Sequence, residues 1–377
     1  MIRFTDPKQT FKINKANIFK SINRTLNSGS YVLGESVKKF EEQFANYIGA
    51  RFAVGVNSGT DALEIAIKSI GIERGDEIIT VSHSALATVS AIISSGAIPV
   101  LVDVDHSYNI NSNLLSKSLT KKTRAVIIVH LYGKPGPIYE VRKFCNKNNL
   151  KLIEDCAQAC GSSIRTKKIG CFGDISAFSF YPTKNLSTFG DGGAIITSKS
   201  KLHISAKKIR QYGWNEKRVS DIPGRNSRLD DIHASILSVK LKNLDHENKL
   251  RLSIANKYNK ELSKLNKHIK LQPLKKNEVH AFHLYVIMLN SKMIRDKLKI
   301  YLYKNHIETG IHYPIPIHRQ PGYSNLVKIR SGNLENTEEF SHRILSLPMH
   351  PWLKNKEINL ILEKIKIFFD RSYSEKS

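Results

Sequence analysis

Short runs of apolar residues, many of them β-branched, recur between residues 52 and 197, and segments with helical periodicity separate them. The runs are almost continuously apolar, which is typical of strands that are covered on both faces in a parallel sheet. Strands that alternate with helices in this way predict an α/β fold. The predicted strands read FAVGV, EIITV, IPVLVD, RAVIIVHL, LKLIED, ISAFSF and GAIIT.

The first predicted strand runs directly into a helix with the sequence NSGTDALEIAIKSIG. Gly71 supplies a C-terminal stop, because glycine readily adopts the left-handed conformation that ends many helices. The apolar face of this helix is formed by Ala62, Leu63, Ala66, Ile67 and Ile70.

A second, smaller unit is predicted after the sheet. The pattern is strongly helical from about residue 232 to residue 265, and the segments HAFHLYVIML and GIHYPIPIHRQPGY follow it. We place the boundary at residue 245, which predicts a large domain over residues 1–245 and a smaller C-terminal α+β domain over residues 246–377. The last residues, SYSEKS, read as a frayed tail.

Composition narrows the classes of protein that this chain could represent. It has no apolar run of the roughly 18 residues that a membrane span needs, and its N-terminus does not resemble a signal peptide, so we expect a soluble, cytoplasmic protein. The net charge of +26 suggests a polyanionic partner, but Lys and Arg are scattered without a recognisable binding module. We therefore expect no nucleic-acid partner, only a surface that attracts small phosphate-bearing ligands.

The four cysteines are too few for a disulfide framework in a chain of 377 residues. Cys156, Cys160 and Cys171 with a histidine could bind zinc in principle, but their spacing contains no tight pair. We expect buried thiols and no metal site.

Three polar elements follow predicted strands, at the edge of a parallel sheet where ligands bind. Gly59 and Thr60 open the first helix, whose N-terminus suits a phosphate, although ordinary helix capping explains the same residues. Asp155 ends an apolar strand, where a carboxylate needs a cation partner unless it caps the next turn. Gln158 can reach the same ligand.

The third element is SFYPTKNLSTFGDGG, in which Ser179 ends a strand and Lys184 precedes a glycine-rich turn. A lysine enclosed there loses solvation, so its pKa falls and the amine becomes nucleophilic toward carbonyls. A phosphate site, a strand-end carboxylate and such a lysine are together what pyridoxal 5′-phosphate requires.

At this point the chain resembles a known family, the DegT/DnrJ/StrS pyridoxal-phosphate-dependent nucleotide-sugar aminotransferases, over almost its whole length. The matching blocks are EDCAQACGS, SAFSFYPTKNLSTFGDGGAI, RQYGWNEK, GRNSRLDDIHASIL and HYPIPIHRQPGY. The resemblance implies the aspartate-aminotransferase fold, also called fold type I. It also implies amino transfer from an amino acid, in most relatives glutamate, to a nucleotide-linked keto sugar. The product would be an aminodeoxy sugar for a surface polysaccharide or an antibiotic.

The resemblance also implies roles for individual residues. Lys184 would form the Schiff base with the cofactor and move the proton, Asp155 would hold the pyridine nitrogen, and Gln158 would contact the phenolic oxygen. The phosphate would be bound by Gly59, Thr60 and Ser179, together with Asn226 from the partner subunit of a homodimer with shared active sites.

Other parts of the resemblance leave alternatives open. His312, Tyr313 and His318 lie in a block that often approaches the sugar, but a Pro-rich loop also needs such residues for packing. Ala85 stands where many relatives carry an aromatic residue that stacks on the pyridine ring. We expect His83 to take the place of that aromatic residue, and the alternative is that His83 has a purely structural role.

Three questions of function complete the prediction. The family resemblance of the segments RQYGW and NSRLDDIHASIL implies an acceptor with its ketone at sugar carbon 3 rather than carbon 4. A sugar dehydratase of the same fold would carry histidine in place of Lys184, so the lysine disfavours it. A non-catalytic binding or regulatory relative would have lost Lys184 or Asp155, and both are present.

Overall fold

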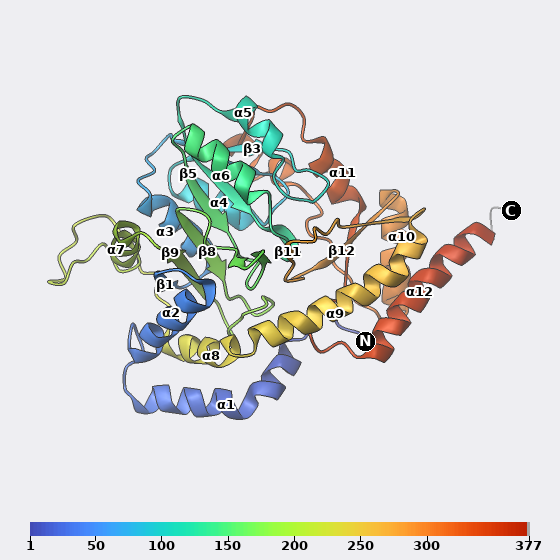
Figure 1. Cartoon of the computed structure of the whole chain (residues 1–377), viewed down its shortest axis with the longest axis horizontal. Coiled ribbons are helices and arrows are strands. Elements are labelled where there is room, and N and C mark those ends of the chain that lie inside the picture. The colour runs from blue at the N-terminus through green and yellow to red at the C-terminus, as the bar shows by residue number, and fades with distance from the viewer. Residues whose placement is uncertain (375–377) are drawn as a thin grey trace.

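A mostly parallel sheet of eight strands forms the centre of the protein (Figure 1). The computed structural model describes residues 1–374, so the last three residues of the predicted tail lie outside it. The spatial order of the strands is β1-β9-β8-β5-β4-β2-β3-β13, and only β9 runs antiparallel to its neighbours. The strands are β1 (Phe52–Val56), β2 (Glu77–Val81), β3 (Ile98–Val102), β4 (Thr123–Val129), β5 (Lys151–Asp155), β8 (Ile175–Ser179), β9 (Gly193–Thr197) and β13 (Lys328–Ile329). Each of the seven predicted runs coincides with one of these strands to within about two residues, so the predicted α/β fold is confirmed.

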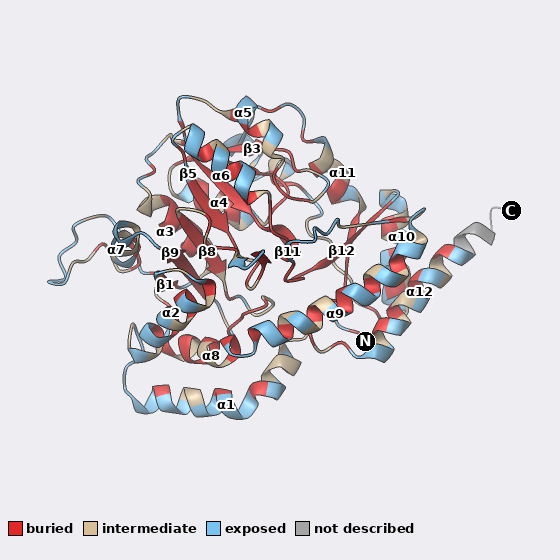
Figure 2. Ribbon diagram, viewed as in Figure 1, coloured by how far each residue is buried: buried red, intermediate tan, exposed pale blue. Residues whose placement is uncertain are grey.

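Helices cover both faces of this sheet, and the strands between them are almost wholly buried (Figure 2). Alternate side chains of β4 serve different cores: Val126 and Ile128 pack with α2, α6 and α8, whereas Ala125 and Ile127 pack with α3, α4 and α7. This double burial explains why the strand sequences are continuously apolar. The helices of this unit are α1 (Pro7–Asn27), α2 (Glu35–Ile48), α3 (Gly59–Ser69), α4 (Leu86–Ser94), α5 (Leu115–Ser118), α6 (Ile138–Lys147), α7 (Ser200–Ile209) and α8 (Asp231–Leu241).

The second unit is built on a three-stranded antiparallel sheet with its own apolar core. Its strands are β10 (Ile269–Leu271), β12 (Tyr285–Leu289) and β14 (Ile344–Leu347), and its helices are α9 (Leu244–Leu262), α10 (Lys292–Lys304), α11 (Glu335–Arg343) and α12 (Asn355–Ser374). A small sheet connects the units, because β11 (Glu278–Val279) pairs with β6 (Ser163–Ile164), which pairs with β7 (Lys167–Lys168). Short 3-10 helices are η1 (Ser112–Leu114), η2 (Leu131–Gly133), η3 (Ser263–Leu265), η4 (Ile317–Arg319) and η5 (Ser324–Leu326).

We retain residue 245, at the start of α9, as the proposed boundary between the units. Two segments are exceptions to it: β13 pairs with β3 of the large sheet, and the first residues of the chain pack in the second unit. Ile2 packs into the core of the second unit and pairs with Ile307 beside α10. The first residues of the chain therefore pack in the smaller unit, and α1, which follows them, packs against α8 of the large unit.

The carboxyl ends of the parallel strands place the site. Asp155 is the last residue of β5, Ser179 is the last residue of β8, and the turn after β1 leads into α3 at Gly59. These ends meet at one edge of the sheet, where helix N-termini point outward. No helix in the described part of the chain is long and apolar enough to cross a membrane.

Candidate active site

One cavity of about 230 Å³ lies at this edge of the sheet. The structure brings six of the predicted site residues into its wall, and Ala85 lies there too. A larger hollow of about 1300 Å³ lies between α1, α2 and α8, but none of the predicted residues lines it. The smaller cavity is therefore the candidate active site, lined by Gly59, Thr60, Asp155, Gln158, Ser179 and Lys184.

The N-terminus of α3 forms the anion-binding end of the cavity. The Ser58 hydroxyl caps the helix by accepting a hydrogen bond from the Asp61 N–H at 3.1 Å. Because Ser58 does the capping, Gly59 and Thr60 are left to face the cavity with backbone N–H groups that have no partner within the helix. Such a helix start suits a phosphate.

Glycine at position 59 is required by a close approach. A Cβ atom at Gly59 would lie 2.6 Å from the Cβ atom of Ser179, a distance that carbon atoms do not tolerate. The missing side chain lets the end of β8 lie against the start of α3. The Ser179 hydroxyl is thereby held beside the N-terminus of α3, on the same anion-binding end of the cavity.

Asp155 is buried, and both of its carboxylate oxygens accept hydrogen bonds. Oδ1 accepts from the Ala157 N–H at 3.1 Å, and Oδ2 accepts from the Thr88 hydroxyl at 2.9 Å. Thr88 gives its only proton to Asp155, so Ser84, 2.9 Å away, donates to Thr88. Burial raises the pKa of Asp155, while these bonds and the charge of Lys184 oppose the rise. The carboxylate therefore caps the next turn, which is one of the two roles expected for it. It also lines the cavity.

Lys184 lies in a loop that is fixed from both units. Its own N–H donates to the Tyr181 carbonyl at 2.8 Å, which closes a turn. The side chain of Asn185 donates to the Ala281 carbonyl at 2.8 Å, and Lys240 donates to Ser187 at 2.6 Å. Burial lowers the pKa of the Lys184 amine to about 8, and the nearby Asp155 charge opposes the shift.

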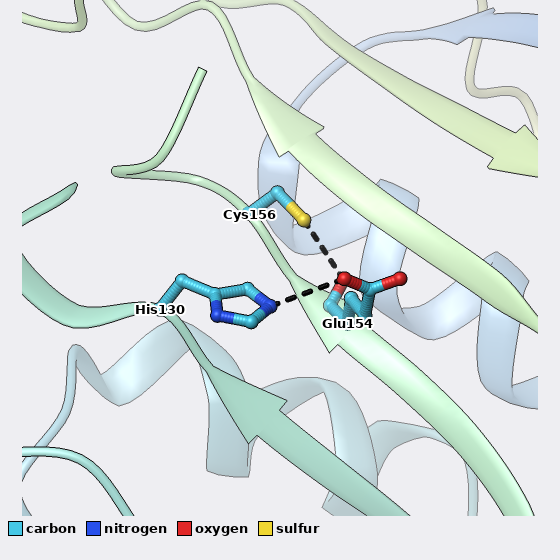
Figure 3. A group of neighbouring side chains, drawn as sticks. All are labelled: His130, Glu154 and Cys156. Atoms are coloured by element: carbon cyan, nitrogen blue, oxygen red, sulfur yellow. Dashed lines mark hydrogen bonds and ion pairs between the residues drawn. The ribbon is translucent and has the colours of Figure 1, made fainter. Parts of the chain in front are cut away.

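A buried group of His130, Glu154 and Cys156 resembles a metal site in composition (Figure 3). Glu154 is nevertheless fully bonded: it accepts from three backbone N–H groups at 2.6–2.9 Å and from His130 at 3.2 Å. His130 Nδ1 accepts the Gly136 N–H at 3.0 Å, so Nε2 carries the proton that Glu154 receives. Burial and the Glu154 charge raise the pKa of Cys156, which stays a thiol. The bonds of His130 and Glu154 are thus made within the protein, where they brace the strand that carries Asp155.

None of the three predicted substrate residues lines the cavity itself, but two of them lie beside residues that do. Tyr313 accepts a hydrogen bond from Gln158 Nε2 at 3.0 Å. His312 stacks on Phe4 and lies close enough to Lys184 for that charge to lower its pKa, after burial, to about 4. These two residues therefore stay candidates for substrate contact.

His318 does not fit its predicted role as a substrate residue. Its Nδ1 is 2.7 Å from the Ser82 hydroxyl and its Nε2 is 2.7 Å from Glu338, so both ring nitrogens are bonded within the protein. The imidazole instead fastens the Pro-rich loop to the end of β2 and to α11. At His318 the structure therefore agrees with the alternative that residues of the Pro-rich loop serve packing within the protein.

His83 likewise does not replace the missing aromatic ring. It is buried outside the wall of the cavity, its Nε2 is 2.8 Å from the Tyr132 hydroxyl, and its ring lies among Tyr108, Tyr132 and Phe340. In the segment after β2, Ala85 lies in the wall of the cavity, whereas His83 points away from the cavity toward Tyr132. The structural alternative holds here as well.

Asn226 lies outside the cavity of its own chain, in the segment after α7 that projects from the sheet (Figure 1). Its two neighbours face inward. Arg225 donates to Asp61 at 3.1 Å and the Ser227 hydroxyl donates to Asp61 at 2.7 Å. Asn226, between them, is exposed.

Sequence reasoning missed several residues that hold the site together. Thr88 donates to Asp155, Asn185 joins the Lys184 loop to the Ala281 carbonyl, and the Tyr132 N–H donates to Gln158, each across a long separation in the chain. Thr88 lies on a helix that reads as ordinary core, and nothing in its periodicity indicates that its hydroxyl reaches β5. A polar residue on the apolar face of a short helix is the one signal that could have identified it.

A type I fold with a strand-end carboxylate, a desolvated lysine and a phosphate-binding helix start defines a pyridoxal-phosphate-dependent enzyme. Comparisons with known protein families and structures agree with this assignment. Residues 12–366 match the DegT/DnrJ/EryC1/StrS aminotransferase family, and the chain belongs to it. It is therefore a pyridoxal-phosphate-dependent aminotransferase.

Individual relatives are similar over most of their length. The chain is 38% identical to the dTDP-3-amino-3,6-dideoxy-alpha-D-galactopyranose transaminase of Aneurinibacillus thermoaerophilus, covering 97% of this chain and 99% of that protein. The structure of S. venezuelae DesV with a ketimine intermediate superposes with a TM-score of 0.93 at 36% identity, over 97% and 98% of the chains. The structure of ntda from Bacillus subtilis with the bound cofactor pmp superposes with a TM-score of 0.89 at 28% identity. The match covers 95% of this chain and 82% of that chain.

We predict that Gly59→Ala weakens cofactor binding, because the new methyl group pushes Ser179 away from the start of α3. We expect a fall in affinity of about tenfold or more, equal to about 1.4 kcal/mol. Titration of the cofactor-free protein with pyridoxal phosphate, followed by absorbance, measures it. Gly322→Ala is the matched control, since nothing lies within 4 Å of a Cβ atom there. Equal affinities of the two variants would contradict the close-approach argument.

We also predict that Lys184 of the cofactor-free protein reacts with amine reagents at unusually low pH. Only the deprotonated amine is nucleophilic, so its reactivity should rise up to about pH 8 and level off above it. An ordinary lysine titrates near pH 10.4. Competitive acetylation followed by peptide mass spectrometry compares Lys184 with the other lysines of the same sample. A midpoint near that of the other lysines would show that the amine is not desolvated.

Proposed function

We propose that this enzyme moves an amino group from L-glutamate to a nucleotide-linked sugar with a ketone at carbon 3. The observation that carries the proposal is the convergence of Lys184, Asp155 and the start of α3 on one cavity. The name of the Aneurinibacillus relative, which acts on a dTDP-linked 3-amino sugar, supports the acceptor class and the position. We propose an aminodeoxy sugar for a surface polysaccharide or an antibiotic as the product.

Each cavity residue has a definite task in this proposal. The bound cofactor supplies a ring that withdraws the electrons left behind when the amino-bearing carbon loses its proton. Lys184 Nζ takes that proton and returns it, because its lowered pKa allows both states near neutral pH. Asp155 keeps the ring nitrogen protonated, and Thr88 holds the carboxylate in position. Gly59, Thr60 and Ser179 bind the phosphate.

The orientation of Gln158 follows from its partners. Its Oε1 accepts the Tyr132 N–H at 2.7 Å, so the amide nitrogen must face the cavity. One N–H of that nitrogen goes to Tyr313, and the second is available to the phenolic oxygen of the cofactor. This supports the role that the family resemblance implies for Gln158.

We further propose that two copies of the chain share their active sites. Asp61 holds both neighbours of Asn226, which directs the asparagine away from its own subunit. Exposed apolar side chains lie at the cavity: Tyr181 lines it, and Leu86 lies between the lining residues Ala85 and Ala87. A second copy that covers them would bring its Asn226 to the phosphate end of this cavity.

The proposed reaction is tested in two stages with purified protein and pyridoxal phosphate. L-Glutamate alone should convert the cofactor spectrum to that of the amine form and release 2-oxoglutarate. Addition of a dTDP-linked 3-keto-6-deoxyhexose should then restore the first spectrum and give the aminated sugar by mass spectrometry. Lys184→Ala should do neither. Amination of the 4-keto isomer alone would refute the position we propose, and an unchanged spectrum with glutamate would refute the donor.

Shared sites predict that two defective variants complement each other. In a mixed dimer of Lys184→Ala and Asn226→Ala chains, one site has lost both residues and the other keeps both. We expect the mixed dimer to bind about half as much cofactor as the wild type, and more tightly than either variant alone. Affinity-tagged mixed dimers and absorbance titration measure this. If the mixed dimer binds no better than the two variants, the sites are not shared.

A further inference from the structure

Tyr132 occupies an unusual position behind the active site. It lies in η2, directly after β4, with φ 62° and ψ 1°, and its side chain is fully buried. Bulky side chains rarely adopt this left-handed conformation, and they persist there only where the surroundings fix them. Its contacts show what fixes it.

The backbone of Tyr132 connects the two units of the protein. Its N–H donates to Gln158 Oε1 at 2.7 Å, and its carbonyl accepts from the Leu284 N–H at 3.2 Å. Gly133 follows with φ 96°, and a Cβ atom there would lie 3.0 Å from both the Gln158 carbonyl oxygen and the His283 nitrogen. The turn therefore fits tightly between the cavity wall and the strand β12 of the second unit.

The hydroxyl of Tyr132 makes a third connection, to the Pro-rich loop. A carbonyl only accepts hydrogen bonds, so the hydroxyl donates its one proton to the His312 carbonyl. The oxygen of the hydroxyl must then accept from His83 Nε2, 2.8 Å away. Burial keeps the pKa of His83 low, at about 3, so the ring is neutral and carries its proton on Nε2.

The result is a set of bonds that surrounds Tyr313. Tyr132 holds the carbonyl of the preceding residue, His312, and it also holds Gln158, whose Nε2 donates to the Tyr313 hydroxyl. Since Tyr313 accepts from Gln158, its own proton is free to be donated elsewhere. Burial raises the pKa of Tyr313 to about 12, so the proton is present at neutral pH.

We propose that Tyr132 is a positioning residue that fixes Gln158 and the His312–Tyr313 segment, so that the Tyr313 hydroxyl donates a hydrogen bond to an oxygen of the bound cofactor or substrate. This inference rests on the function proposed above. It adds that one buried residue holds the glutamine of the cavity through its backbone N–H and the loop of the second unit through its hydroxyl. Tyr132 itself touches no reacting atom and acts through Tyr313.

The test begins with Tyr132→Phe, which keeps the ring and adopts the same backbone conformation at the same cost. Tyr108→Phe is the matched control, because Tyr108 is buried in the same aromatic cluster, with its ring 5.6 Å from that of Tyr132. Hydrogen exchange of the cofactor-free protein, read by mass spectrometry, reports on peptides that cover residues 308–316. We expect exchange there to be about tenfold faster in Tyr132→Phe, the effect of one lost hydrogen bond, and unchanged in Tyr108→Phe.

The second readout separates positioning from general destabilisation. We expect Tyr132→Phe to bind pyridoxal phosphate within about threefold of the wild-type affinity and to slow the conversion of its spectrum by saturating L-glutamate about tenfold. Tyr313→Phe should slow the same step. The double variant should be no slower than Tyr313→Phe alone, because Tyr132 acts through that hydroxyl.

Multiplicative effects in the double variant, or unchanged exchange over residues 308–316, would overturn the inference. A loss of cofactor affinity as large as the loss of rate would also do so, because it would mean that the whole site had loosened. Failure of the proposed function looks different. The wild-type spectrum would then not respond to L-glutamate, whereas the exchange experiment on cofactor-free protein would still decide whether Tyr132 holds the loop.

Discussion

The balance of charge in one small cavity is the constraint on which the rest of the structure depends. Asp155 and Lys184 are both desolvated, and burial opposes the charged form of each. The charge of each group opposes the pKa shift that burial causes in the other, so a carboxylate and an amine are held together in one cavity. A cofactor with a basic ring nitrogen and an aldehyde matches this pair. The N-terminus of α3 supplies the positive pole that the phosphate of that cofactor requires.

Rigidity at the cavity comes from residues that do not line it as reacting groups. Thr88 fixes the carboxylate of Asp155, Asn185 fixes the loop of Lys184, and Tyr132 fixes the amide of Gln158. Each of these bonds reaches a segment distant in the chain, and one of them, from Asn185 to the Ala281 carbonyl, reaches the second unit. The site is therefore assembled from both units, and small errors in their packing would displace the reacting atoms.

Several positions illustrate how far the sequence can be read. Asp155 and Ser179 could be placed correctly because each ends an apolar run, and the end of a parallel strand lies at the ligand edge wherever the sheet is buried on both faces. His83 and His318 were misplaced for a different reason. A histidine near a site in sequence has no periodic signal that fixes the direction of its ring. Here Tyr132 binds one ring, and Ser82 with Glu338 binds the other.

The sequence by itself determined the strands, the helices between them and the chemistry at the strand ends, because burial on two faces imposes a pattern that local residues must obey. Gly59 is a partial case: its place in a phosphate turn was readable, but its need to lack a side chain comes from Ser179, 120 residues away. The hydrogen bonds of Tyr132 were decided only by tertiary structure. Their partners come from the segment that leads into β12, the Pro-rich loop and the turn after β5, and separations of that length leave no trace in any short stretch of sequence.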